Sequence, residues 1–115
     1  MKYIFEKELH YNREYLGLKF EEKYKMLNNI FNETVLSKDD KFDWLKGIDD
    51  TISGNLIDGD FGVQSGFGAE VGKEKTIIYC DFTDEEIEIS TEEFKRISEI
   101  WFDNLEEFQK TGKLK

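Results

Sequence analysis

The sequence contains no proline, one cysteine and one histidine, and its 26 acidic residues outnumber its 16 basic residues. Cys80 cannot form a disulfide within the chain, and Cys80 together with His10 is too small a set for a Cys/His zinc site. No apolar run approaches the roughly 18 residues of a membrane span, and no cationic segment followed by an apolar stretch opens the chain. We therefore expect a soluble cytoplasmic protein with no membrane partner, no metal and no cofactor.

The formal net charge of −10 has the wrong sign for direct binding to DNA or RNA, whose phosphates attract basic surfaces. The 115 residues are 38% hydrophobic and 15% aromatic, which is enough for a core. The composition therefore predicts one folded domain over residues 1–115. Residues 39–109 hold twenty acids and six bases, so almost all of the imbalance lies there. Such a surface serves solubility, or it attracts a basic partner.

Apolar periodicity predicts one strand and two helices in the first half of the chain. Alternation over residues 2–9 indicates a strand, and Gly17 interrupts the pattern that follows. Spacings of three and four over residues 20–32 indicate an amphipathic helix. A second helix is predicted over residues 41–53, with Gly54 as its C-terminal cap.

The second half predicts a three-stranded antiparallel meander followed by a long helix. Apolar residues and glycines alternate over residues 61–72, and residues 75–82 and 86–89 read as two further strands joined by short turns. Ser90 and Glu93 have the spacing of a capping box at the start of a helix that ends at Gly112. The expected fold is therefore α+β, in the order β-α-α-β-β-β-α: an antiparallel sheet, formed by the N-terminal strand plus the meander, packed with about three helices.

The glycines at even positions leave one face of the first meander strand nearly bare of side chains. One explanation is structural, because missing side chains let a helix or an aromatic ring approach closely. The other is a flat patch on which a partner's backbone could lie, rimmed by Asp58, Asp60 and Glu70. The sequence alone leaves both explanations open.

The residues offer little support for catalysis. His10 reads as an edge residue and Cys80 as a small hydrophobic one, so a nucleophile with a base is not expected. The Asp58-Gly59-Asp60 segment lacks the later oxygen ligands of an EF-hand and reads as a turn. Counting cannot exclude a pair of carboxylates like that of a glycosidase, so a small acidic hydrolase remains an alternative to the non-enzymatic reading.

A run of acidic residues around the last two meander strands contains no base between Asp81 and Glu93. Glu92 and Glu93 suit the positive end of the following helix. Four others have no such local role, and with the three residues at the glycine-rich strand they form the expected partner-binding set: Asp58, Asp60, Glu70, Asp84, Glu85, Glu86 and Glu88.

The segment TIIYCDFTDEEIEISTEEF, residues 76–94, followed by a helix containing Trp101, resembles the strand-turn-strand-helix ending of many small bacterial immunity proteins. These are the cytoplasmic antidotes to contact-dependent and other polymorphic toxins. The similarity covers residues 76–115 and consists of residue types rather than an invariant signature. It implies a small, acidic, non-catalytic protein that binds a toxin domain, often a basic nuclease, at or near its active site.

The resemblance and the charge together predict a cytoplasmic immunity protein that inhibits a cognate toxin, most plausibly a basic nuclease, by stoichiometric binding. Trp44, Phe61 and Tyr79 are candidate aromatic anchors of that contact, and each fits the core equally well. Two alternatives stay open: the acidic hydrolase, and an acidic adaptor or nucleic-acid mimic that binds another basic protein.

Overall fold

The structure is a computed structural model that describes residues 2–33, 40–54, 59–60 and 67–114. Its elements, in chain order, are β1 (Tyr3–His10), β2 (Arg13–Phe20), a 3-10 turn (Glu22–Tyr24), α1 (Met26–Glu33), α2 (Lys41–Ser53), β3 (Gly59–Asp60), β4 (Phe67–Val71), β5 (Lys75–Cys80), β6 (Glu86–Ser90) and α3 (Thr91–Thr111). All strand pairings are antiparallel. The α+β class and the three-strand meander β4, β5 and β6 are as predicted, although residues 61–66 of the first predicted meander strand lie outside the described residues. Gly59 and Asp60, predicted as part of a turn, instead form the short strand β3, because their backbone pairs with β4.

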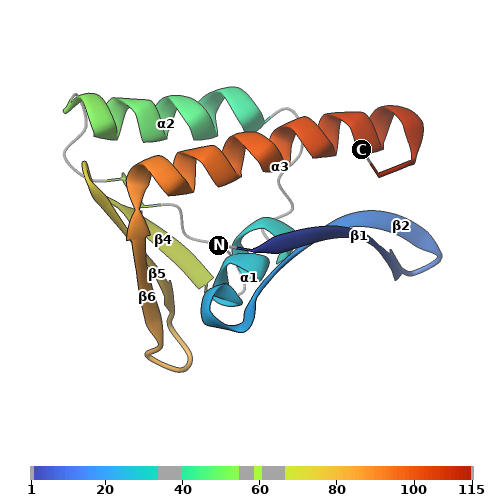
Figure 1. The fold of residues 1–115 in the computed structure, drawn as a ribbon, viewed down its shortest axis with the longest axis horizontal. Helices are drawn as coiled ribbons and strands as arrows, with labels where there is room; N and C mark the ends of the chain where they lie inside the picture. Colours follow the sequence, from blue (N-terminus) through green and yellow to red (C-terminus); the bar gives the residue numbers. More distant parts are fainter. Residues whose placement is uncertain (1, 34–39, 55–58, 61–66, 115) are drawn as a thin grey trace.

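The helices join two separate sheets (Figure 1). The first sheet is the β1–β2 hairpin, and the second has the order β3-β4-β5-β6. Helix α3 runs above both sheets, with α2 beside it, while α1 packs against β2 on one side and against β4 and β5 on the other. The meander face that meets α1 and α3 contributes buried side chains to the core: Ala69, Val71, Thr76, Ile78, Cys80 and Ile89.

The N-terminal region differs from the prediction, because the first strand does not join the meander. It pairs with β2, which the sequence reading missed, through a two-residue turn in which Tyr11 and Asn12 have φ of 52° and 63°. Such turns need positive φ at both central residues to match the twist of the strands. Leu16, Leu18 and Phe20 are buried at alternate positions of β2, so Phe20 ends a strand rather than beginning a helix.

Gly17 lies inside β2 and does not interrupt it. The side chain of Glu8, on the neighbouring strand, lies over Gly17, where an added Cβ would be 2.5 Å from Glu8 Oε1. A glycine in a strand commonly marks such a close approach. A side chain at this position would have to displace the flexible end of Glu8, which glycine avoids.

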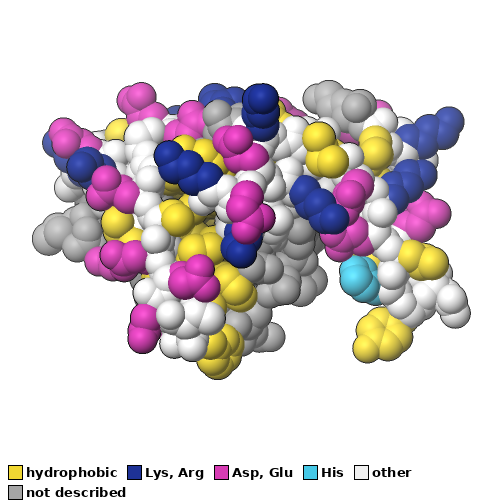
Figure 2. Space-filling model, turned by 60° about the horizontal axis from the view of Figure 1, so that its bottom comes forward, with side chains coloured by type: hydrophobic (Ala, Val, Ile, Leu, Met, Phe, Trp, Pro, Cys, Tyr) yellow, Lys and Arg dark blue, Asp and Glu magenta, His cyan; other side chains and the backbone are white. Residues whose placement is uncertain are grey.

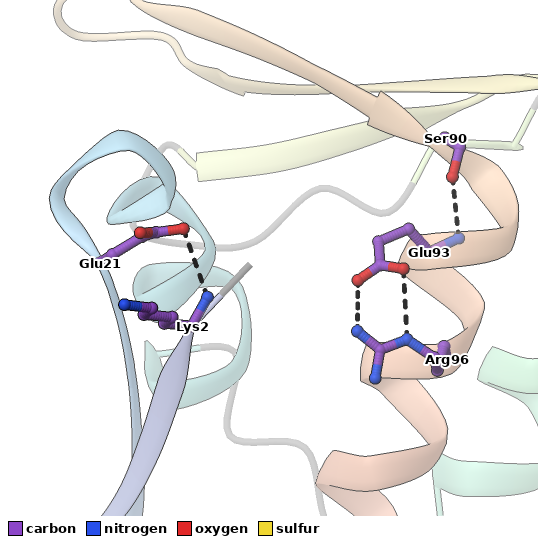
Figure 3. A network of polar contacts seen from close by, with 5 residues as sticks. All are labelled: Lys2, Glu21, Ser90, Glu93 and Arg96. Carbon is purple, nitrogen blue, oxygen red and sulfur yellow. Dashed lines mark hydrogen bonds and ion pairs between the residues drawn. The ribbon is translucent and has the colours of Figure 1, made fainter.

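Helix α3 begins after Ser90 as predicted, with one of the two bonds of a capping box, because the Glu93 carboxylate bonds Arg96. Ser90 Oγ accepts a hydrogen bond from the backbone N–H of Glu93 at 3.1 Å, and the Glu93 carboxylate is held by the Arg96 guanidinium through two contacts (Figure 3). This ion pair lowers the pKa of Glu93 and raises that of Arg96. Gly112 ends the helix in the left-handed conformation, with its N–H donating to the carbonyl of Phe108. The cap fixes the point at which β6 passes into α3.

Candidate partner-binding surface

The meander has one face turned toward the helices and one turned away from them. The second, which we call the outer face, carries two rows of side chains that cross β4, β5 and β6 in register. One row is Glu70, Ile77 and Glu88, and the other is Gly68, Tyr79 and Glu86. Residues directly opposite each other on paired strands project to the same side and are close neighbours. Lys75 lies two residues before Ile77 on β5 and so projects to the same side. The outer face is therefore formed by these seven residues: Gly68, Glu70, Lys75, Ile77, Tyr79, Glu86 and Glu88.

Charge and exposure follow a simple pattern on the outer face. Glu70, Glu86 and Glu88 are exposed, whereas Ile77 and Tyr79 between them are half-buried. Figure 2 shows acidic side chains (magenta) with hydrophobic ones (yellow) between them over the part of the molecule that holds the meander. An apolar centre flanked mainly by acidic side chains is the composition of a surface that recognises a basic protein.

One base lies among these acids. Lys75 Nζ is 3.4 Å from Glu88 Oε2, and both side chains are more than half exposed. An ion pair this exposed contributes little to stability. Glu70 and Glu86 make no ion pair with a base within the described residues. The outer face therefore keeps a net negative charge.

The seven acids predicted as a binding set do not all lie together. Glu70, Glu86 and Glu88 share the outer face. Asp60 pairs with Glu70 through the β3–β4 backbone, but its side chain, like the whole of Asp58, lies outside the described residues.

Asp84 and Glu85 lie in the turn between β5 and β6, away from the two rows of the outer face. Asp84 has φ of 58°, and its N–H donates to the carbonyl of Cys80 at 3.1 Å. The N–H of Cys80 donates in turn to the carbonyl of Glu85 at 3.0 Å. These bonds close the turn, so the two acids form a group separate from the outer face.

Glu85 borders a cavity of about 250 Å³ between this turn and the start of α1. Its described lining consists of Lys25, Met26, Asn28, Phe67, Cys80, Thr83 and Glu85. Lys25 Nζ is 3.1 Å from Glu22 Oε1, and this contact, with a smaller contribution from Glu85, raises the pKa of Lys25. Asn28 Oδ1 accepts a hydrogen bond from the N–H of Phe20 at 2.8 Å. The polar groups of Lys25 and Asn28 are thus already engaged within the chain.

Among the described residues, the placement of the carboxylates gives little support to the hydrolase alternative. Glu85 is the one carboxylate in the described lining of this cavity, while Glu70, Glu86 and Glu88 lie on a sheet face. A glycosidase needs two carboxyl groups on either side of a bound sugar. In the described parts of the chain, no group of three or more His, Cys, Asp or Glu residues could hold a metal ion.

The other residues singled out from the sequence have clear positions. Trp44 is buried, with Nε1 donating to Ser98 Oγ at 3.0 Å, so it belongs to the core. Tyr79 lies on the outer face, and Phe61 is outside the described residues. His10 ends β1, with Nε2 at 3.2 Å from Glu8 Oε2. The sequence reading missed Lys75, because only the strand register brings it to Glu88.

Comparison of the chain with protein-family models, with curated proteins and with solved structures found no match. Among the helices in the described ranges, none is long and apolar enough to cross a membrane.

Proposed function

We propose that this chain is a cytoplasmic immunity protein, which binds a cognate toxin domain and neutralises it by stoichiometric inhibition. The observation that carries the proposal is the outer face, where Glu70, Glu86 and Glu88 surround Ile77 and Tyr79. A nuclease binds phosphates with a basic surface, so an acidic face of this kind is complementary to it. This complementarity favours a basic nuclease as the toxin.

The net charge of −10 supports the same proposal through the rate of association. Opposite charges on two proteins steer their encounter and raise the association rate, and salt screens this effect. Fast capture matters for an inhibitor that must act before a nuclease reaches its substrate. The half-buried Ile77 and Tyr79 supply apolar contact area once the proteins meet.

The test begins with the neighbouring gene, which we expect to encode a secreted protein ending in a basic toxin domain. The two proteins should form a nanomolar complex that abolishes the nuclease activity at equimolar ratio. Changing Glu70, Glu86 and Glu88 to Lys should lower the association rate by about tenfold at low salt. The single changes Glu86→Lys and Glu99→Lys alter the net charge equally, so Glu99→Lys, on the exposed surface of α3, is the control and should have a much smaller effect than Glu86→Lys.

Two results would contradict the proposal. One is the absence of any complex with the neighbouring toxin domain. The other is a complex whose formation depends equally on the control residue Glu99 and on the outer face. If the chain instead binds a basic protein that has no toxic activity, the adaptor alternative replaces the immunity function.

A further inference from the structure

The ladder of hydrogen bonds between β5 and β6 determines which residues of β6 direct their N–H and C=O groups toward the exposed edge. β6 is the last strand of its sheet, with β5 as its partner on one side. At one end of the ladder the N–H of Cys80 donates to the carbonyl of Glu85, and at the other the N–H of Thr91 donates to the carbonyl of Glu74. Hydrogen-bonded pairs recur at every second residue of an antiparallel ladder. These two bonds therefore determine the direction of every backbone group between them.

Ile87 and Ile89 are the residues of β6 that bond to β5, because they lie two and four residues from Glu85. Glu86 and Glu88 lie between them and direct their N–H and C=O groups away from β5. Within the described residues, no hydrogen bond reaches these outward groups. Both glutamates are also exposed. The edge is therefore accessible to an added strand.

We propose that the edge of β6 binds an extended segment of the partner by antiparallel strand pairing, and that this segment carries Lys or Arg at alternate positions. This inference rests on the proposed function, since it assigns a binding mode to the basic toxin. An added strand would place every second side chain beside Glu86 and Glu88 on the outer face. Opposite charges on neighbouring strands are favourable, which selects basic residues at these positions.

The same geometry disfavours a second copy of this chain as the occupant. Antiparallel pairing of two β6 edges around Ile87 would put Glu86 of each copy opposite Glu88 of the other. Like charges placed directly opposite each other destabilise a pair of strands. Charged residues commonly protect edge strands from such self-association. Because both exposed side chains are acidic, the protection fails against a basic strand.

A synthetic peptide of alternating lysine and threonine provides the test with the intact chain. NMR should show slower solvent exchange of the Glu86 and Glu88 amides when this peptide binds. In a strand paired antiparallel to β6, with lysines opposite Glu86 and Glu88, the lysine amides face β6 and the threonine amides face away. N-methylation of the lysine amides should weaken binding by about fivefold for each lost hydrogen bond, whereas N-methylation of the threonine amides should leave this edge contact intact. Equal affinities for the two methylated peptides would overturn the inference, because attraction would then be only electrostatic.

Two variants at one position provide a second test. Glu88→Pro and Glu88→Thr both remove the charge, but only proline removes the outward N–H. Proline is tolerated on an edge strand where its N–H is not part of the ladder. Glu88→Pro should bind the peptide about fivefold more weakly than Glu88→Thr. Equal binding by two folded variants would overturn the inference, and if Glu88→Pro does not fold, the methylated peptides still decide.

The peptide separates this inference from the proposed function. If the peptide pairs with β6 but the neighbouring toxin domain does not bind, the immunity function is wrong and the edge site remains. If the toxin binds while the Glu86 and Glu88 amides exchange as in the free chain, the function remains and strand pairing is wrong.

Discussion

Tyr79 lies across Gly68 on the neighbouring strand, so closely that a Cβ atom added to Gly68 would collide with the phenol ring. The glycine therefore provides space for an aromatic ring of the same chain. Of the two explanations for the bare glycine face, the structural one applies at this position. Because the ring of Tyr79 lies over Gly68, this contact also fixes the position of the ring on the outer face.

The first prediction concerns this pair. Gly68→Ala should lower the free energy of unfolding by about 1 kcal/mol, because the added methyl group forces the ring of Tyr79 out of its place. In a Tyr79→Ala background the same change should be neutral or stabilising, since alanine suits a strand better than glycine. Urea unfolding of the four proteins gives the coupling energy. If Gly68→Ala changes the free energy of unfolding equally in both backgrounds, the position of the Tyr79 ring does not depend on the glycine.

The two tryptophans allow a comparison between an indole N–H that has a hydrogen-bond acceptor and one that has none among the described residues. Both are buried, but Trp44 Nε1 donates to Ser98 Oγ, whereas Trp101 Nε1 has no hydrogen-bond partner in the described structure. Trp→Phe removes the same atoms at each position. Trp44→Phe should therefore cost about 1 kcal/mol more than Trp101→Phe in unfolding experiments. A larger cost at Trp101 would contradict the assignment of its unpaired N–H.

Ser90 is predicted to stabilise the start of α3. Ser90→Ala removes the acceptor for the N–H of Glu93 and should lower the free energy of unfolding by about 1 kcal/mol. Ser53→Ala is the control, because Ser53 Oγ donates to the carbonyl of Asp50 at the exposed end of α2. That change should stay within about 0.5 kcal/mol. Thermal unfolding of both variants would reveal whether the cap has the expected effect.

Local sequence signals were sufficient to predict the bounds of the last two helices. The bounds of α2 and the capping residues of α3 agree with the prediction, because Gly54, Ser90 and Gly112 act on the backbone next to them. The β1–β2 hairpin was missed for the opposite reason. Its turn uses Tyr11 and Asn12 instead of the usual glycine, and the side chain that lies over Gly17 belongs to Glu8 on another strand.

The candidate site was predictable in part. The alternation of Glu86 and Glu88 is visible in the sequence, and the register places both on the outer face. Glu85 comes directly before Glu86 in the sequence but borders the cavity near Lys25. Neither this separation nor the contact of Lys75 with Glu88 follows from charge alone, because both depend on how strands pair.

The pH dependence of stability should include a contribution from Glu93. Because Arg96 lowers the pKa of Glu93 below its ordinary value of 4.5, the ionised carboxylate stabilises the folded state above that pH. This stabilisation is lost as the pH falls through the lower folded-state pKa. The stability difference between wild type and Glu93→Gln should therefore be constant near neutral pH and shrink in acid, with a size of at most about 1 kcal/mol. In an Arg96→Gln background the acid-dependent part should be largely absent.

Lys75 should limit the attraction of the outer face for basic ligands. Lys75→Gln removes the ion pair with Glu88 and should change the free energy of unfolding by less than about 0.5 kcal/mol, because both side chains are more than half exposed. The same change makes the outer face more negative, so the alternating lysine and threonine peptide should bind more tightly at low salt. Lys73→Gln gives the same net charge, but Lys73 is an exposed residue of the turn that follows β4. Calorimetric titration should show a larger gain for Lys75→Gln than for Lys73→Gln. Equal gains would mean that the net charge of the protein, rather than the outer face, determines the affinity.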